Sequence, residues 1–291
     1  NVLKIREKSL GPEHNEVATS LNDLALVYRS QGLYEKAEPL FKRSIDIYEK
    51  ELGADHLYIA TSLTNLAILY ESQALFDKAE PLFKRALKIT EKSYGAEHLE
   101  VAKSLKNLAM FYGKQTKHEK AEPILKRVIS INEKSFGPEH PNVAIHISDL
   151  AGIYTNQSLN QKAIKLYEKA LKINKKNFGS NHIKTATTLT SLGGIYRVVG
   201  LHDKAITYLK KALKTYQEEL VSDSQVNGYS TALTFLARTY HDQGLYSKAE
   251  PLYERALAYE ENLGENDNYI ANLTNNLALL YSDKGLNTKA Q

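Results

Sequence analysis

Histidine is the residue in this sequence whose type and spacing most suggest chemistry. Five of the nine histidines stand three residues after a glycine and 42 residues from the next: His14, His56, His98, His140 and His182. Imidazole nitrogens bind transition metals, but the ligands of one ion must lie about 2 Å from it. If each repeat is two packed helices, each about 10 Å thick, equivalent histidines lie roughly 20 Å apart. The spacing therefore predicts no metal site, and we interpret these histidines as loop or helix-capping residues.

No other group of residues suggests catalysis. The chain has no cysteine, which excludes disulfides, thiolate metal sites and a cysteine nucleophile. The remaining histidines do not extend this series, and the sequence contains neither a phosphate-binding loop nor a glycine-rich dinucleotide motif. We therefore expect a protein that is not an enzyme and that needs no cofactor.

Charge and hydropathy argue against nucleic acid and membrane as partners. Among 291 residues, 38 Lys and Arg are set against 34 Asp and Glu, and segments such as Glu35–Arg43 interleave the two signs. This pattern is typical of a solvated helix surface and not of a nucleic-acid interface. No apolar run approaches the ~18 residues of a membrane span, and no signal peptide is visible. We expect a cytoplasmic protein and, because both ends interrupt a motif, a fragment of a longer chain.

The periodic histidines belong to a repeat that runs along the whole chain. One tyrosine marks each repeat, with successive steps of 42, 42, 42, 42, 44 and 41 residues. These tyrosines are Tyr28, Tyr70, Tyr112, Tyr154, Tyr196, Tyr240 and Tyr281. In the first repeat, apolar residues recur at helical spacing from about Glu16 to Gln31 and from about Tyr34 to Glu51. Each repeat is therefore predicted to be two helices, with Gly32 at the end of the first.

Small residues recur at one position of each helix. In the first helix they are Ala25, Ala67, Ala109, Ala151, Gly193, Ala237 and Ala278; in the second they are Ala37, Ala79, Ala121, Ala163, Ala205 and Ala249. Small side chains let two helix axes approach to the near end of the ~8–10 Å range. A single helix pair cannot bury its apolar face alone, so the pairs must stack into a solenoid with a curved groove.

The repeat resembles the tetratricopeptide repeat, and more closely its kinesin light chain subtype. Asn65–Tyr70 reads N-L-A-I-L-Y, Lys78–Leu87 reads K-A-E-P-L-F-K-R-A-L, and L-G-x-x-H recurs between repeats. The usual tetratricopeptide period is 34 residues, whereas the light-chain subtype has the longer period found here. The resemblance implies an all-α, right-handed superhelical solenoid of antiparallel helix pairs, in which the first helix of each pair lines the concave side.

On this reading the chain is a single solenoid with six full repeats and a partial repeat at each end. Residues 1–10 end a preceding second helix. The full repeats span about 16–53, 58–95, 100–137, 142–179, 184–221 and 226–264, and residues 268–291 begin another. The repeat departs from its period around Val221–Gly228 and near Gly264, where we expect a local change of superhelical geometry.

The groove positions of the first helices predict the binding residues. They are Asn22, Leu26, Thr64, Asn65, Ile68, Lys103, Lys106, Asn107, Met110, Lys114, Ser148, Thr190 and Arg238. Asparagine side chains can donate to and accept from a peptide backbone, and the apolar members could receive apolar side chains of a ligand. Gly152 and Gly194 occupy one of these positions, where the lack of a side chain could widen the groove or could only weaken those helices, by roughly 1 kcal/mol each.

Three lysines, Lys103, Lys106 and Lys114, make the third repeat the most basic. They could receive acidic residues of a partner, as the light-chain resemblance implies, or they could serve only as a solvated surface.

Three functions are compatible with such an array. It could be an adaptor that binds a partner protein or peptide in its groove. It could be the sensor arm of a larger signalling protein, or a scaffold whose copies stack on one another. The first is the favoured interpretation.

Overall fold

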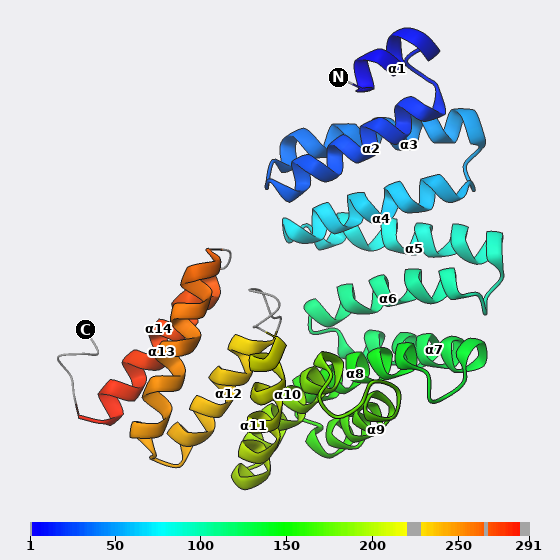
Figure 1. The fold of residues 1–291 in the computed structure, drawn as a ribbon. Helices are drawn as coiled ribbons and strands as arrows, with labels where there is room; N and C mark the ends of the chain where they lie inside the picture. The colour runs from blue at the N-terminus through cyan, green and yellow to red at the C-terminus, as the bar shows by residue number, and fades with distance from the viewer. Residues whose placement is uncertain (1, 220–227, 265–266, 286–291) are drawn as a thin grey trace. The chain divides into compact units, whose positions relative to one another are not determined.

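The computed structural model describes residues 2–219, 228–264 and 267–285, and Figure 1 shows their fold. The chain forms two compact units, Asn1–Pro138 and Glu139–Gln291. The helices of the first unit are α1 (Val2–Leu10), α2 (Asn15–Ser30), α3 (Tyr34–Leu52), α4 (Leu57–Ser72), α5 (Phe76–Tyr94), α6 (Leu99–Lys114) and α7 (His118–Phe136). Those of the second are α8 (Pro141–Asn156), α9 (Asn160–Phe178), α10 (Ile183–Val198), α11 (His202–Glu219), α12 (Tyr229–Asp242), α13 (Tyr246–Leu263) and α14 (Asp267–Asp283). The described residues contain no strand, so the predicted all-α class is confirmed.

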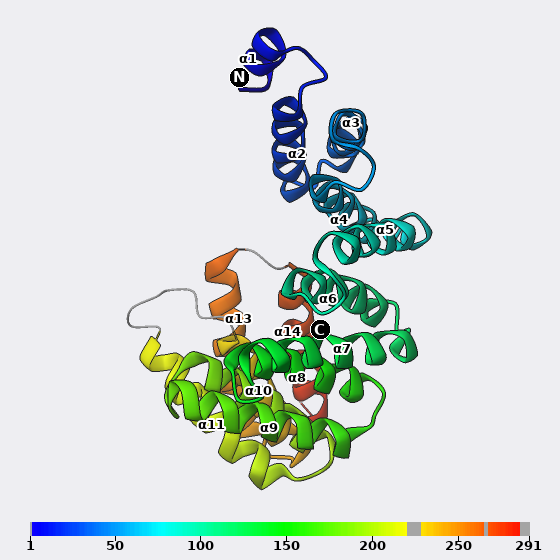
Figure 2. The ribbon, with the colours of Figure 1, turned by 90° about the vertical axis from the view of Figure 1, so that its right-hand side faces the viewer.

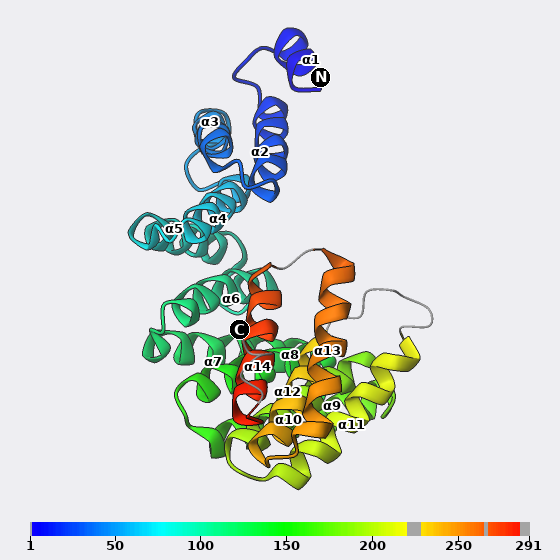
Figure 3. The ribbon, with the colours of Figure 1, turned by 90° about the vertical axis from the view of Figure 1, so that its left-hand side faces the viewer.

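The helices pack in pairs, and we call the first helix of each pair helix A and the second helix B. In the first unit, α2, α4 and α6 form the helix A layer, and α3, α5 and α7 form the helix B layer (Figure 2). In the second unit, α8 pairs with α9, α10 with α11, and α12 with α13, and α13 also packs against α14 (Figure 3).

The periodic histidines cap the N-termini of the helices A. The Nδ1 atom of His98 accepts a hydrogen bond from the backbone N–H of Glu100 at 3.2 Å. His14, His56, His140 and His182 make the same bond to the residue two positions later. Each bond satisfies one of the backbone donors that a helix N-terminus leaves without an intrahelical partner. The capping interpretation is therefore confirmed.

Left-handed residues end the helices A. Gly32 has φ +73°, and the next residue, Leu33, donates its N–H to the Tyr28 carbonyl at 2.8 Å. This bond closes a Schellman motif, and it confirms the predicted role of Gly32. In three repeats a residue with a side chain takes the same conformation: Ala74, Thr116 and Ser158 each have φ 58°. Those three ends carry strain that glycine would relieve.

The small residues lie where helix A meets helix B. Ala25, Ala67, Ala109 and Ala151 of helix A, and Ala37, Ala79, Ala121, Ala163, Ala205 and Ala249 of helix B, are all fully buried. At Gly193 a Cβ atom would overlap the side chain of Leu209. Helix A and helix B are therefore in direct contact at these positions.

The K-A-E segment of helix B connects successive repeats. The Lys78 ammonium lies 5.4 Å from the centre of the Tyr70 ring in the same repeat, a cation–π distance. Glu80 accepts a hydrogen bond at 2.9 Å from the Tyr112 hydroxyl of the next repeat. Burial raises the pKa of Tyr112, and the bond to Glu80 raises it further. The repeating tyrosine therefore marks a contact within each repeat and a contact between repeats.

Gly194 does not widen a groove. The ring of Phe235 on α12 lies over it, and a Cβ atom there would be 2.7 Å from Cε2 of that ring. The prediction of a wider groove at Gly194 is therefore wrong, because the missing side chain makes room for direct packing of α12 on α10. The predicted changes of geometry around Val221–Gly228 and near Gly264 fall largely on residues 220–227 and 265–266, outside the described residues.

Candidate peptide-binding surface

Ten of the predicted binding residues belong to the helix A layer of the first unit. They are Asn22 and Leu26 on α2, Thr64, Asn65 and Ile68 on α4, and Lys103, Lys106, Asn107, Met110 and Lys114 on α6. We call the exposed and half-buried side chains of α2, α4 and α6 the helix A face. Ser148, Thr190 and Arg238 lie on α8, α10 and α12 of the second unit.

These side chains differ in their access to solvent. Lys103, Asn107, Met110, Lys114 and Arg238 are exposed, and Leu26, Thr64, Asn65, Ile68, Lys106 and Ser148 are half-buried. Asn22 and Thr190 are buried, at 9% and 5% exposure. Neither of these two presents its side chain to solvent in this structure.

The hydroxyl residues among them bond to their own helices. Thr64, Ser148 and Thr190 each donate to the carbonyl four residues earlier, at 2.8, 2.9 and 3.0 Å. Such back-bonding uses the hydroxyl hydrogen locally. At this repeat position, only the lone pairs of the hydroxyl are left to accept a bond from a ligand.

Lys103 and Lys114 of the third repeat pair with acids of the same surface. Lys103 lies 2.6 Å from Glu100 on its own helix, and Lys114 lies 3.1 Å from Glu71 on α4. The surface around them is therefore less basic than the lysines alone suggest. Sequence reasoning missed Glu71 because it stands 43 residues from its partner and was not considered as a groove residue.

A short apolar stripe crosses the helix A face, on which Val27 and Tyr58 are the most exposed apolar side chains, at 50% and 53%. Leu26, Ile68 and Met110 occupy the same position of three successive repeats, and Met110 is 38% exposed. Asn65 lies next to this stripe and donates from Nδ2 to the Asn22 Oδ1 atom at 3.1 Å. Apolar contact and carboxamide groups therefore occur side by side, as the recognition of a peptide requires.

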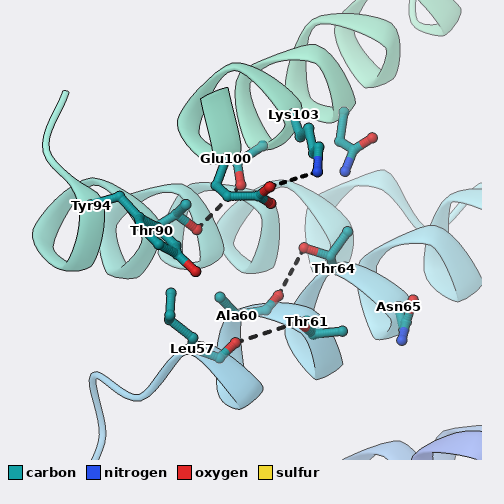
Figure 4. Close-up of a pocket in the computed structure, with 11 residues that line it drawn as sticks. Leu57, Ala60, Thr61, Thr64, Asn65, Thr90, Tyr94, Glu100 and Lys103 are labelled. Atoms are coloured by element: carbon teal, nitrogen blue, oxygen red, sulfur yellow. Dashed lines mark hydrogen bonds and ion pairs between the residues drawn. The ribbon is translucent and has the colours of Figure 1, made fainter. Parts of the chain in front are cut away.

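A pocket of about 230 Å³ opens beside the stripe, between α4, the end of α5 and α6 (Figure 4). Its lining residues are Leu57, Ala60, Thr61, Thr64, Asn65, Thr90, Tyr94, Glu100, Lys103, Ser104 and Asn107. Four of them, Thr64, Asn65, Lys103 and Asn107, are predicted binding residues. The contribution of helix B through Thr90 and Tyr94 was missed, because the groove was assigned to helices A alone.

Comparison with known proteins places this architecture in a family. The family model described as tetratricopeptide repeat matches residues 1–50, 24–92, 58–134, 100–158, 143–218 and 228–291. The chain belongs to the tetratricopeptide repeat family. Tetratricopeptide repeats are generally modules of protein–protein interaction and typically non-catalytic. No curated protein matches the chain by sequence.

Several solved structures share the tetratricopeptide fold of this chain. BtubC (BKLC) from P. vanneervenii is 20% identical, with a TM-score of 0.66 over 80% of this chain and 93% of that one. A kinesin light chain-like protein of Podosopora anserina, with nearly identical TPR-like repeats, is 24% identical, with a TM-score of 0.63 over 73% and 99%. Aspartyl phosphate phosphatase F from Bacillus subtilis is 14% identical, with a TM-score of 0.62 over 86% and 72%. The resemblance to kinesin light chain-like repeats is confirmed at the level of the fold.

The described residues offer neither a metal site nor a membrane span. Among the described residues, no three His, Cys, Asp or Glu side chains lie close enough together to hold a metal ion. Within the same residues, no helix is both long and apolar enough to cross a bilayer.

Proposed function

We propose that this protein is a cytoplasmic adaptor of the kinesin light chain-like type, which binds a segment of a partner protein on the helix A face of its first unit. The observation that carries the proposal is the stripe of half-buried Leu26 and Ile68 and exposed Met110, beside the carboxamides of Asn65 and Asn107. Apolar side chains supply most of the free energy of peptide binding, and polar groups fix the orientation of the peptide.

Acidic residues in the partner would bind through the lysines of the third repeat. In this structure Glu100 and Glu71 already pair with Lys103 and Lys114, so a partner carboxylate must exchange with them. Changing Lys103, Lys106 and Lys114 to Gln together should weaken acidic peptides more than neutral ones. Equal weakening of both, or a library that shows no acidic preference, would remove the acidic partner from the proposal.

The single methionine of the sequence gives a direct test of the binding surface. Met110 is the only methionine in the chain, so [methyl-¹³C]methionine labelling places one NMR signal on the stripe. Peptides selected from a random display library against the whole chain should shift this signal in a saturable manner. The proposal is wrong if tight-binding peptides leave the Met110 signal unchanged.

A further inference from the structure

Tyrosine fills the space between helix B and its own helix A in the first repeat. Tyr48 is 4% exposed, and its hydroxyl lies 2.8 Å from Thr19 Oγ1 on α2. Its ring lies 5.4 Å from the ring of Tyr58, which belongs to the helix A of the next repeat. Two phenol side chains therefore occupy the junction between the first and second repeats.

The contact between a helix B tyrosine and a helix A threonine recurs in the second unit. Tyr216 stands four repeat periods after Tyr48 and is fully buried. Its hydroxyl lies 3.4 Å from Oγ1 of both Thr187 and Thr190, and Thr187 stands four periods after Thr19. A helix B tyrosine bonded to this helix A threonine is thus a packing solution that the chain uses twice.

The second repeat keeps the threonine but lacks the tyrosine. Thr61 is the equivalent of Thr19, whereas Thr90 replaces Tyr48 and Glu100 replaces Tyr58. Both replacements remove an aromatic ring, and the pocket of about 230 Å³ lies at this junction. Figure 4 shows Thr61, Thr90 and Glu100 around it.

The remaining contacts hold the walls of the pocket in place. Thr90 donates to the Ala86 carbonyl at 2.8 Å and accepts from Ser104 at 3.2 Å. Glu100 pairs with Lys103 at 2.6 Å. Leu57, Ala60 and Tyr94 contribute apolar surface to the lining. The walls therefore offer both a ring-sized space and a hydroxyl partner.

We propose that this pocket receives a tyrosine side chain of the bound partner segment, whose hydroxyl bonds Thr61 as Tyr48 bonds Thr19. The proposal rests on the proposed function, since the tyrosine belongs to a segment bound on the helix A face. Burial of the ring supplies the affinity. The bond to Thr61 favours tyrosine over phenylalanine by about three- to tenfold, the value of one hydrogen bond.

The chain offers its own blocking variant. Thr90→Tyr installs the residue found at this position in two other repeats, Tyr48 and Tyr216, so the pocket is filled from within. Thr90→Asn installs asparagine, which two further repeats carry at this position as Asn132 and Asn174. It should fill the pocket in part. Thr19→Val is the matched control, because it removes a hydroxyl at the equivalent helix A position without touching the pocket.

The first experiment uses N-acetyl-L-tyrosinamide as the probe and the methyl signals of Ala60, Thr61 and Thr90 in the whole chain as the readout. We expect saturable shifts at these methyls and weaker binding of N-acetyl-L-phenylalaninamide. Thr90→Tyr should lower the affinity by at least about tenfold, Thr90→Asn by less, and Thr19→Val should leave it unchanged. Binding that survives Thr90→Tyr, or shifts that never saturate, would overturn the proposal.

The second experiment separates this proposal from the proposed function. Peptides selected on the helix A face should contain tyrosine and lose affinity in Thr90→Tyr. If they shift the Met110 signal but bind Thr90→Tyr as tightly as the unchanged chain, the pocket proposal fails and the proposed function stands. If the tyrosinamide binds as expected while no selected peptide shifts Met110, the pocket is a phenol site and the proposed function fails.

Discussion

The Lys114 ammonium lies 3.1 Å from the Glu71 carboxylate, and this ion pair joins the C-terminal ends of the helices A of two successive repeats. The side chain of Glu71 is only 9% exposed. The second unit makes the same link with the signs reversed, since Arg197 lies 2.8 Å from Asp242. The charges at these positions therefore have a role in stacking the repeats, whatever they contribute to binding.

Reversing one charge of this pair should destabilise the first unit. Lys114→Glu places a second carboxylate beside the nearly buried Glu71, and we expect a loss of about 1–2 kcal/mol, between the values of exposed and buried pairs. The double variant Glu71→Lys with Lys114→Glu should recover most of that loss. Urea unfolding followed by circular dichroism measures both. Lys103→Glu is the control, because its exposed pair within one helix is worth at most about 0.5 kcal/mol.

The cap of α6 predicts a difference between two substitutions of His98. Alanine removes the acceptor of the Glu100 N–H and should cost about 1 kcal/mol of unfolding free energy, whereas asparagine is itself a good N-cap. His98→Asn should therefore lie closer to the unchanged chain, apart from the loss of ring stacking on Tyr94. If the two variants unfold at the same urea concentration, the Nδ1 bond contributes nothing to stability.

The left-handed residue at the end of α6 predicts a stabilising change. Thr116 has φ 58°, and glycine adopts this conformation without the steric cost of about 1–2 kcal/mol. After the greater entropy loss of glycine is subtracted, Thr116→Gly should gain about 0.5–1 kcal/mol. The opposite change, Gly32→Ala, should lose a similar amount. Thermal unfolding of both variants checks the sign, and a destabilised Thr116→Gly would contradict the assignment.

Buried tyrosines predict a loss of stability at alkaline pH. Burial raises the pKa of Tyr253 from 10.0 to about 12, so the folded chain retains a proton that the unfolded chain releases. The stabilisation is complete below about pH 10 and is lost as the pH rises through about 12, at roughly 1.4 kcal/mol per pH unit. Between about pH 10 and pH 12, the free energy of unfolding of Tyr253→Phe should therefore fall less steeply with pH, by roughly 1.4 kcal/mol per pH unit. Equal slopes for the two chains would show that Tyr253 titrates normally.

The helices and their packing could be predicted from the sequence because every repeat places the same residue types at the same contacts. Local roles repeat with the period and can be recognised from it: close helix packing at Ala25, the helix end at Gly32 and the helix cap at His98. The position of Thr190 in its repeat predicts a groove residue. Its burial beside Tyr216 depends on the rotation of each helix about its own axis, which the period does not give. Glu71 and Phe235 show the same limit, since their contacts join neighbouring repeats and are set by three-dimensional register.

The pocket illustrates why the site was only partly predictable. Asn65, Lys103 and Asn107 follow from the groove positions of helix A. Thr90 and Tyr94 lie on helix B, and their importance comes from a side chain that is smaller than its equivalents. A comparison of Thr90 with Tyr48 and Tyr216 could have revealed the hollow from the sequence, given the knowledge that this position faces the next repeat.

The central claim is that the stripe on the helix A face of the first unit binds the partner segment, and calorimetric titration of one selected peptide tests it most directly. Met110→Arg should fold normally, because Arg238 occupies the same repeat position in the second unit. Leu279→Arg is the matched control, because Leu279 also occupies this repeat position and is 51% exposed. We expect Met110→Arg to weaken the peptide by at least about tenfold and Leu279→Arg to leave its affinity unchanged. Full affinity in Met110→Arg would contradict the account.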